Sequence, residues 1–392
     1  MLEQVAAVTL MNLRSLPQRL GTSWVIVVGI AVTVAVLVSV LAMDAGFRKT
    51  LAGTARADRA IVLRGGSNAE LSSTISRENT LTIMDAAGVA RGPAGKPIAS
   101  AEAVSIVALP LKRTGTAANV TLRGVGPQAF ALRPELHLVA GRMFRPALRE
   151  LIVGRSAVEQ FKGVAIGGHI AFRDSDWTVV GEFDSGGDAH ESELVGDIET
   201  VLSAFRRNLF QSVTVRLESA QAFDRYKAAL TTDPSLSVDV LRETDYYAGQ
   251  SRQLNKLLGF LAVFVGGFMA VGAMFGALNT MYAAVAARSA EIATLRAIGF
   301  SALPVVVSVF AEALLLSLLG GAAGAAAAWM FFNGNAVNTL GANFTQVVFR
   351  LSVTPALLAQ GIAWACCIGA LGGLFPALRA ARMPVAAALR AG

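Results

Sequence analysis

Four long apolar runs alternate with polar sequence along the chain and predict four membrane-spanning helices. The first run, Trp24 to Met43, has no charged residue over 20 positions. As a helix it would be about 30 Å long, which matches the hydrocarbon core of a bilayer. A cleavable signal peptide would have a shorter apolar region and a small-x-small cleavage site, whereas this run ends at Met43-Asp44. We therefore expect a retained first span at 22–45.

The other three apolar runs lie in the second half of the chain. They extend from Leu257 to Ala287, from Val305 to Phe332 and from Pro355 to Ala377, and each is long enough to cross a membrane. With their flanking residues we expect spans at 253–287, 304–332 and 355–378. A short segment at 288–303 and a loop at 333–354 would join them.

Between the first two spans the pattern changes to short runs of β-branched residues that are separated by Gly, Pro and Asp. Such runs predict strands and turns, here at 118–125, 150–154, 177–183 and 212–217. Helical spacing occurs at 156–161 and 220–231. We therefore expect a large α+β extracytoplasmic domain at 46–252 with a core of its own. It would form one body or two lobes, the second starting near residue 125.

The charge distribution predicts the orientation of the spans. The chain carries a formal charge of +7, yet residues 44 to 252 hold 25 Lys and Arg against 24 Asp and Glu. The excess lies in short segments beside the apolar runs, which argues against a nucleic-acid-binding surface and follows the positive-inside rule. We expect a multi-pass protein of the inner (cytoplasmic) membrane with both termini in the cytoplasm. Probes at position 190 would then react from outside and probes at 290 from inside.

Both cytoplasmic ends are short. Residues 1–21 place Leu2, Val5, Val8 and Leu13 at helical intervals before Pro17 and are typical of an amphipathic helix on the membrane surface. Residues 379–392 would form a cytoplasmic tail.

The residues needed for chemistry are scattered. Cys366 and Cys367 are adjacent within the last apolar run, and His137, His169 and His190 lack the spacing of metal ligands. The nearest approach to a phosphate-binding loop is RGPAGKP at 91–97, which lacks the leading Gly and the final Ser or Thr. We therefore predict a chain that is not an enzyme, with no metal site and no cofactor of its own.

The segment between the second and third spans has a pattern of its own, RSAEIATLRAIGFSALP at 288–304. Arg288 and Glu291 would share one face of a helix, and Gly299 would end it. Ser301 could cap the next helix, with Pro304 in its first turn. Apolar residues recur every third position, at Ile292, Leu295 and Ile298. The pattern predicts an amphipathic helix that is either a passive connector or a surface on which a partner binds.

Three features inside the spans are candidates for helix contacts. Gly272 and Gly276 have the GxxxG spacing that lets helices approach closely, as in a dimer interface, although so glycine-rich a chain also yields such pairs by chance. Asn279 in the same span could hydrogen-bond to another helix. Glu312 is an intramembrane acid, which is a functional candidate by default. Because a second acid or His for a proton relay is missing, we favour a structural role for Glu312 between helices.

The order of these motifs resembles the MacB/FtsX-like permeases of ABC transporters, of the mechanotransmission type (type VII). The segment after the second span is similar to their RxxEIxxLRAxG pattern, at Arg288, Glu291, Ile292, Leu295, Arg296, Ala297 and Gly299. Glu312 to Gly320 and the stretch from Gly373 through Pro376, Arg379, Pro384 and Arg390 are also similar, as are Asn12 to Arg14 near the start. In the outer domain the similar segments are 120–130, 139–144 and 177–183.

The resemblance implies that residues 288–300 form a coupling helix for a separate ABC ATPase subunit, which would bind ATP and Mg²⁺. It also implies a second permease copy, identical or not, and leaves room for a periplasmic adaptor (membrane fusion) protein. Export, efflux or transport of lipid or lipoprotein across the envelope is the expected function. The alternative is an FtsX-like signalling scaffold that regulates a cell-wall hydrolase and moves no substrate. MacB itself carries a fused nucleotide-binding domain, which we do not find in this sequence.

Overall fold

The computed structural model describes residues 4–5, 8–11, 20–340 and 345–382. The features expected at Leu2, at Leu13, at Asn12 to Arg14 and in the tail beyond residue 382 lie outside these residues. The chain forms two compact units, each built from separate segments. The first, the helical unit, consists of Met1–Ala45, Lys256–Asn335 and Leu351–Gly392, and the second, the α+β unit, of Gly46–Asn255 and Ala336–Arg350.

Four helices are long and apolar enough to cross a membrane, as the hydropathy pattern predicts. They are α2 (Leu20–Thr54), α8 (Glu243–Ala287), α10 (Ala302–Phe332) and α11 (Pro355–Arg382). All four extend beyond the expected bounds, and two of them do so most: α2 continues to residue 54, past 45, and α8 begins ten residues before 253. Hydropathy marks only the stretch that matches the lipid core, because the backbone hydrogen bonds of a helix continue through polar residues such as Arg48.

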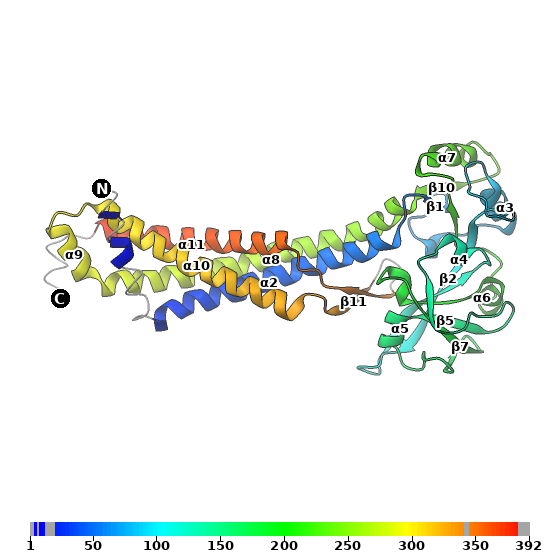
Figure 1. Ribbon diagram of the computed structural model, residues 1–392, viewed down its shortest axis with the longest axis horizontal. Coiled ribbons are helices and arrows are strands. Elements are labelled where there is room, and N and C mark those ends of the chain that lie inside the picture. The colour runs from blue at the N-terminus through cyan, green and yellow to red at the C-terminus, as the bar shows by residue number, and fades with distance from the viewer. Residues whose placement is uncertain (1–3, 6–7, 12–19, 341–344, 383–392) are drawn as a thin grey trace. The chain divides into compact units, whose positions relative to one another are not determined.

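Small residues bring the helices of the helical unit close together. Gly369 and Gly373 on α11 face Ser317 and Ala313 on α10, and the two helices run side by side (Figure 1). A Cβ atom at Gly320 would lie 2.8 Å from the carbonyl oxygen of Val27 on α2. Two further GxxxG pairs of the sequence, Gly320 with Gly324 and Gly369 with Gly373, are therefore used for packing within the chain.

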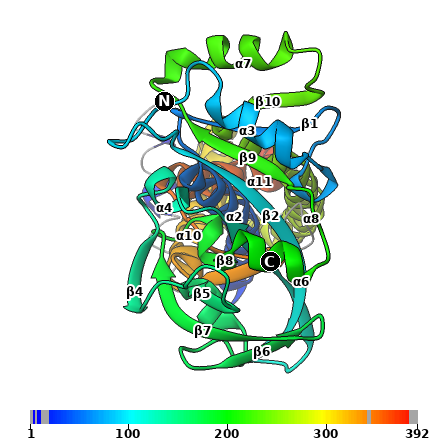
Figure 2. The same ribbon diagram turned by 90° about the vertical axis from the view of Figure 1, so that its right-hand side faces the viewer.

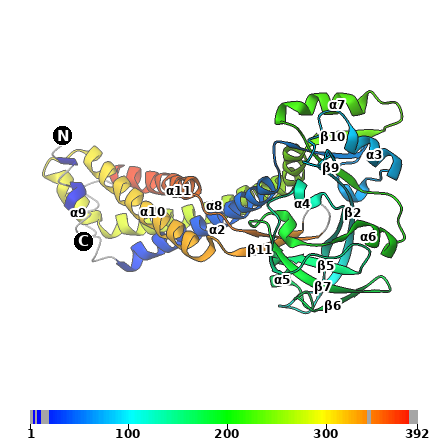
Figure 3. The ribbon, with the colours of Figure 1, turned by 45° about the vertical axis from the view of Figure 1, so that its right-hand side comes forward.

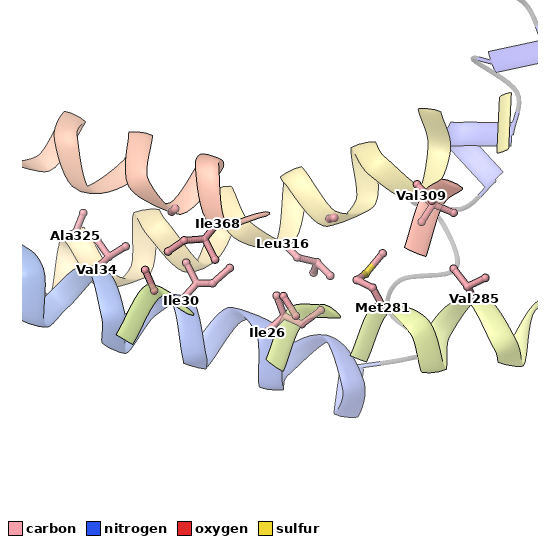
Figure 4. Close-up of a cluster of buried hydrophobic side chains, with 14 of the residues drawn as sticks. Ile26, Ile30, Val34, Met281, Val285, Val309, Leu316, Ala325 and Ile368 are labelled. Atoms are coloured by element: carbon pink, nitrogen blue, oxygen red, sulfur yellow. The ribbon is translucent and has the colours of Figure 1, made fainter. Parts of the chain in front are cut away.

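Buried aliphatic side chains fill the space between these helices. Ile30 and Val34 on α2 lie against Leu316 on α10 and Ile368 on α11 in one continuous cluster (Figure 4). The cluster extends to Met281 and Val285 on α8 and to Ile292 in the short segment that follows.

The α+β unit is built on one ten-stranded sheet, and neighbouring strands lie in the order β10-β1-β9-β2-β3-β8-β5-β7-β4, with β6 on β7 (Figure 2). Pairing is antiparallel except between β3 and β8 and between β5 and β7. The strands are β1 (Arg59–Arg64), β2 (Ala99–Pro110), β3 (Ala117–Val125), β4 (His137–Gly141), β5 (Glu150–Gly154), β6 (His169–Phe172), β7 (Ser175–Asp184), β8 (Glu193–Asp197), β9 (Ser212–Arg216) and β10 (Val238–Arg242).

Short helices cover the sheet. They are η2 (Glu70–Ser72), α3 (Arg77–Asp85), α4 (Ala129–Leu132), α5 (Arg155–Gln160), η3 (Ala189–Ser192), α6 (Ile198–Ala204), η4 (Ala220–Ala222) and α7 (Phe223–Thr231). Figure 3 shows α3, α7 and β10 towards one end of the sheet and β5, β6 and β7 towards the other. The α+β class expected from the sequence is thus observed, together with the predicted strands and helices.

Among the described residues, three clusters of buried apolar side chains lie along this sheet. One contains residues 60–101 and 213–240, including Tyr226, and a second contains residues 101–210, including Trp177. The chain passes between these two clusters at the start of β2 and again near residue 211. Val125 is the last residue of the central strand β3 and belongs to the third cluster, with Ile152 and Phe183. The sheet is continuous at the lobe boundary expected near residue 125.

The segment expected as a plain loop at 333–354 contains a β-hairpin, β11 (Ala336–Leu340) and β12 (Gln346–Arg350). It belongs to the α+β unit, which is therefore not confined to 46–252. The amide of Val348 donates to Ser192 Oγ at 3.0 Å, and the Phe349 ring meets that of Phe47 edge to face at 5.5 Å. These contacts come from residues far away in sequence, so local pattern did not reveal them.

Candidate functional site

The segment between the second and third spans forms a helix, α9 (Ser289–Ala297), and a glycine ends it. Gly299 adopts φ +102°, which favours glycine, and its amide donates to the carbonyl of Arg296 at 3.2 Å. The amide of Phe300 donates to the carbonyl of Leu295 at 3.1 Å. These two bonds form a Schellman motif, which satisfies the last carbonyls of the helix and reverses the chain toward α10.

The start of α10 matches the predicted position, with one difference in its cap. Ser301 occupies the N-cap position and Pro304 lies in the first turn. The Ser301 side chain makes no capping hydrogen bond in the described structure. Proline is favoured at this end of a helix because the first amides have no intrahelical partner.

The apolar positions of α9 do not form one buried stripe. Ile292 is buried, Leu295 is half-buried, and Ile298, at the C-cap, is 68% exposed. A spacing of three residues falls about 60° short of a full turn at each step, so the third position has rotated away from the first. Glu291 also lies on the exposed side. The helix therefore has a buried face and an exposed face that carries Glu291 and Ile298.

Arg288 and Glu312 form a buried ion pair. Arg288 Nη1 lies 3.1 Å from Glu312 Oε2, and the two side chains are only 4% and 6% exposed. The role between helices that we favour for Glu312 thus has a specific partner. The local spacing predicts Arg288 on one helix face with Glu291. The contact with Glu312 could not be predicted from that spacing, because Arg288 precedes α9 and turns inward to a residue 24 positions away.

A second arginine joins the other end of α9 to the last span. Arg296 Nη1 donates to the carbonyl oxygen of Ala381, near the end of α11, at 2.7 Å. In addition, the Arg379 guanidinium lies over the Tyr282 ring of α8 at 5.3 Å. Arg296, which the resemblance assigns to partner binding, is thus used for contacts within this chain.

The candidate interface residues on α8 lie on an open surface. A Cβ atom at Gly272 or Gly276 would meet no atom of the described chain within 4 Å. Asn279 is exposed and does not bond across to another described helix. In its most apolar stretch α8 is 17% buried, against 39% to 44% for the other three spans. Phe268 and Phe275 are among the large apolar side chains exposed there.

The α+β unit contains a buried cluster of charges that the sequence analysis did not predict. Arg123 on β3 binds Glu70 at 2.8 Å, Glu102 at 2.7 Å and Glu193 at 2.7 Å. Arg133 also contacts Glu102. The cluster connects β2, β3, β8 and η2, and only the alternation of charged and apolar residues within these strands hinted at it.

The pKa values of the carboxyl groups in the cluster depend on their burial and on the arginines beside them. Burial alone would raise the pKa of Glu102 and Glu193, but Arg133 and Arg123 outweigh it and hold both pKa values below the usual range. Glu243 differs, because burial outweighs Arg59 and raises its pKa. His190 is buried and lies 3.1 Å from Glu193. In the described residues, no group of three or more His, Cys, Asp or Glu side chains could hold a metal ion.

Two family models match the chain. The MacB-like periplasmic core domain matches residues 23–233, and the FtsX-like permease C-terminal region matches residues 263–385. Among curated proteins, the macrolide export ATP-binding/permease protein MacB 1/2 of Paracoccus denitrificans is 25% identical over 94% of this chain and 56% of its own length. The MacB of Chromobacterium violaceum is 32% identical over 34% of this chain and 19% of its own. The chain thus spans little more than half the length of the Paracoccus denitrificans protein.

Solved structures with similarity include the periplasmic region of MacB from Actinobacillus actinomycetemcomitans, at 14% identity and a TM-score of 0.36 over 48% of this chain and 90% of that one. The extracellular domain of the ABC-type transporter YknZ from Gram-positive bacteria is 18% identical, with a TM-score of 0.36 over 47% of this chain and 99% of that one. The first family model alone covers more than half of the chain. The chain belongs to the MacB/FtsX-like permeases of the ABC transporter type, with four candidate membrane spans and an α+β domain between the first two.

Proposed function

We propose that this permease couples ATP hydrolysis by a separate ABC ATPase subunit to conformational change in its α+β domain. The ATPase would bind ATP and Mg²⁺ and dock on α9 from the cytoplasm. The transport process would be export or efflux, or the movement of lipid or lipoprotein across the envelope. A second permease copy would complete the membrane part, with the open surface of α8 around Gly272 and Gly276 as its contact.

The two faces of α9 carry this proposal. On one face Ile292 packs into the core of the helical unit, and the helix ends are held by Arg288 and Arg296. On the other face Glu291 and Ile298 are exposed. The opposite face of the helix is fixed by packing within the chain. A large exposed apolar residue beside a charge is typical of a surface that a partner protein covers.

The test is reconstitution with the ABC ATPase that co-purifies with the tagged chain. We expect wild-type permease to bind this ATPase and to change its rate of ATP hydrolysis. Ile298→Asp should weaken binding about 30-fold, because a central apolar anchor is replaced by a charge. Glu291→Lys should weaken it as well. Ile298 is a sharper choice than Leu295, because Leu295→Asp would also disturb a half-buried contact.

Leu81→Asp is the matched control. Leu81 is also exposed, at 62%, but it lies on α3 in the α+β unit, so its replacement should leave ATPase binding unchanged. Normal binding by Ile298→Asp, or equal losses in both variants, would contradict docking at α9. ATP-dependent movement of a labelled lipid or drug in proteoliposomes would identify a transporter, whereas coupling without movement, together with a bound hydrolase, would identify the signalling scaffold.

A further inference from the structure

The buried ion pair beside α9 is a strong constraint on how that helix can move. Arg288 immediately precedes α9, and Glu312 lies on α10, with 3.1 Å between their charged atoms. Separating two charges in a low-dielectric interior leaves each of them uncompensated, which is far more costly than separating an exposed pair. The pair therefore favours one arrangement of the two helices and resists others.

The surroundings of the pair leave little room for water. Apolar side chains from four segments line a cavity of only about 20 Å³ beside the two charges, among them Val8, Met281 and Val309, and Glu291 lines it as well. Ser308 Oγ donates to the carbonyl of Val8 at 3.4 Å, which brings the N-terminal segment over α10. A space of this size holds about one water molecule. The attraction between Arg288 and Glu312 is therefore little screened by solvent.

The far end of α9 is joined to α11, which in turn packs closely on α10. Arg296 donates to the carbonyl of Ala381. Gly369 and Gly373 on α11 lie in close contact with side chains of α10. Helix α8 has the smallest buried share of the four spans. The contacts of Arg288 and Arg296 thus join α9 to α10 and to α11.

We propose that Arg288 and Glu312 act as a clamp that makes α9, α10 and α11 move as one body when force is applied to α9. They are positioning residues, since they act through the placement of α9 and not on the ATPase itself. This inference rests on the proposed function, in which the ATPase applies the force to α9. The clamp would pass that force to the third and fourth spans together.

The first experiment measures the clamp without any ATPase. Spin labels at Ala297→Cys and Leu319→Cys, both exposed positions, would report the distance between α9 and α10 in lipid nanodiscs, with Cys366 and Cys367 replaced by Ala. We expect one narrow distance in wild type. Arg288→Gln, Glu312→Gln and the double variant should each lose that narrow distance to the same extent, because removing either partner already opens the clamp.

The double variant guards against misfolding, since it leaves no uncompensated buried charge and should fold even where a single variant does not. A narrow distance in the double variant, or additive effects of the two single changes, would overturn the clamp. Arg382→Gln is the matched control: Arg382 lies exposed at the end of α11, and its replacement should leave the distance unchanged.

The second experiment adds the reconstituted ATPase. With ATP and vanadate, the 297–319 distance should stay the same in wild type while a label pair between α8 and α10 changes. The clamp variants should bind the ATPase normally but lower the coupling between hydrolysis and the α8–α10 change roughly 2- to 30-fold. A change of the 297–319 distance in wild type would overturn the clamp alone. Failure of wild type to bind the ATPase would overturn the proposed function instead, whatever the nanodisc result.

Discussion

Arginines stabilise each unit by joining groups from different elements. In the α+β unit, Arg123 is 4% exposed and binds three carboxylates from different elements, which a neutral side chain could not replace. In the helical unit, buried Arg288 pairs with Glu312 on α10, and half-buried Arg296 donates to the carbonyl of Ala381 on α11. Guanidinium groups suit such places because they offer five donors in a fixed plane and remain charged.

Replacing Arg123 should therefore destabilise the α+β unit strongly. Arg123→Met leaves Glu70 and Glu193 buried without their main partner, so we expect the free energy of unfolding to fall by about 3–5 kcal/mol. Urea unfolding of the full chain in detergent measures this through Trp177, with the other three tryptophans replaced by Phe. The control is Arg77→Met, whose ion pair with Glu199 is more than half exposed and should contribute less than about 1 kcal/mol. Equal losses in both variants would contradict the prediction.

The same cluster predicts how stability depends on pH. The pKa values of Glu102 and Glu193 are lower in the folded protein than their usual 4.5, so the unfolded chain binds protons first on acidification. Their contribution is complete above pH 4.5 and is lost progressively as the pH falls below it. Glu243, whose pKa is raised, contributes in the opposite direction. Two carboxyl groups with a lowered pKa stand against one with a raised pKa. We therefore expect the urea concentration at the unfolding midpoint to decrease below pH 4.5. An increase on acidification would contradict this expectation.

At the scale of elements, GxxxG pairs with the same spacing have different environments. Gly320 and Gly324 on α10 lie against the backbone of α2, whereas Gly272 and Gly276 on α8 face open space. Sequence spacing is identical in the two cases. What differs is whether another helix of the same chain is present at that surface.

A matched pair of substitutions separates these two roles. Gly324→Val inserts a side chain where the Ala31 backbone already lies, so we expect a loss of at least about 1–3 kcal/mol in the stability of the helical unit. Gly272→Val has space and should leave the thermal unfolding midpoint unchanged while weakening cross-linking between two copies in the membrane. Unchanged cross-linking in Gly272→Val would argue against α8 as the contact between copies.

At the scale of the whole molecule, neither unit is a continuous stretch of the chain. The helical unit takes its residues from three segments, and the α+β unit takes the hairpin β11–β12 from a point far beyond its main segment. A fragment that comprises only residues 46–252 would therefore lack part of the α+β unit, including the contact of Val348 with Ser192.

The orientation of the chain across the membrane is tested by cysteine labelling, and the structure improves the choice of sites. Position 190, expected from the sequence to be accessible, is 1% exposed, because His190 packs inside the α+β unit. Thr114 in the turn between β2 and β3 is exposed and replaces it, and Ala290 on α9 is exposed as well. In a variant without Cys366 and Cys367, we expect an impermeant maleimide to label Thr114→Cys in intact cells and Ala290→Cys only after lysis. The reverse pattern would contradict the positive-inside orientation.

The sequence by itself determined the four spans, the α+β domain between the first two, the helix before Gly299 and the family. Each of these depends on local properties: 20 uncharged residues in a row, alternation within a strand, or a glycine after a helix. Only the tertiary structure decided which charges pair, how the buried apolar side chains of the α+β unit divide into clusters and which glycine pair is open. Glu312 shows the reason, since its partner Arg288 is 24 residues away and is brought to it by the turn after α9. Contacts between distant residues depend on how helices and strands pack, and packing is not encoded in any single local pattern.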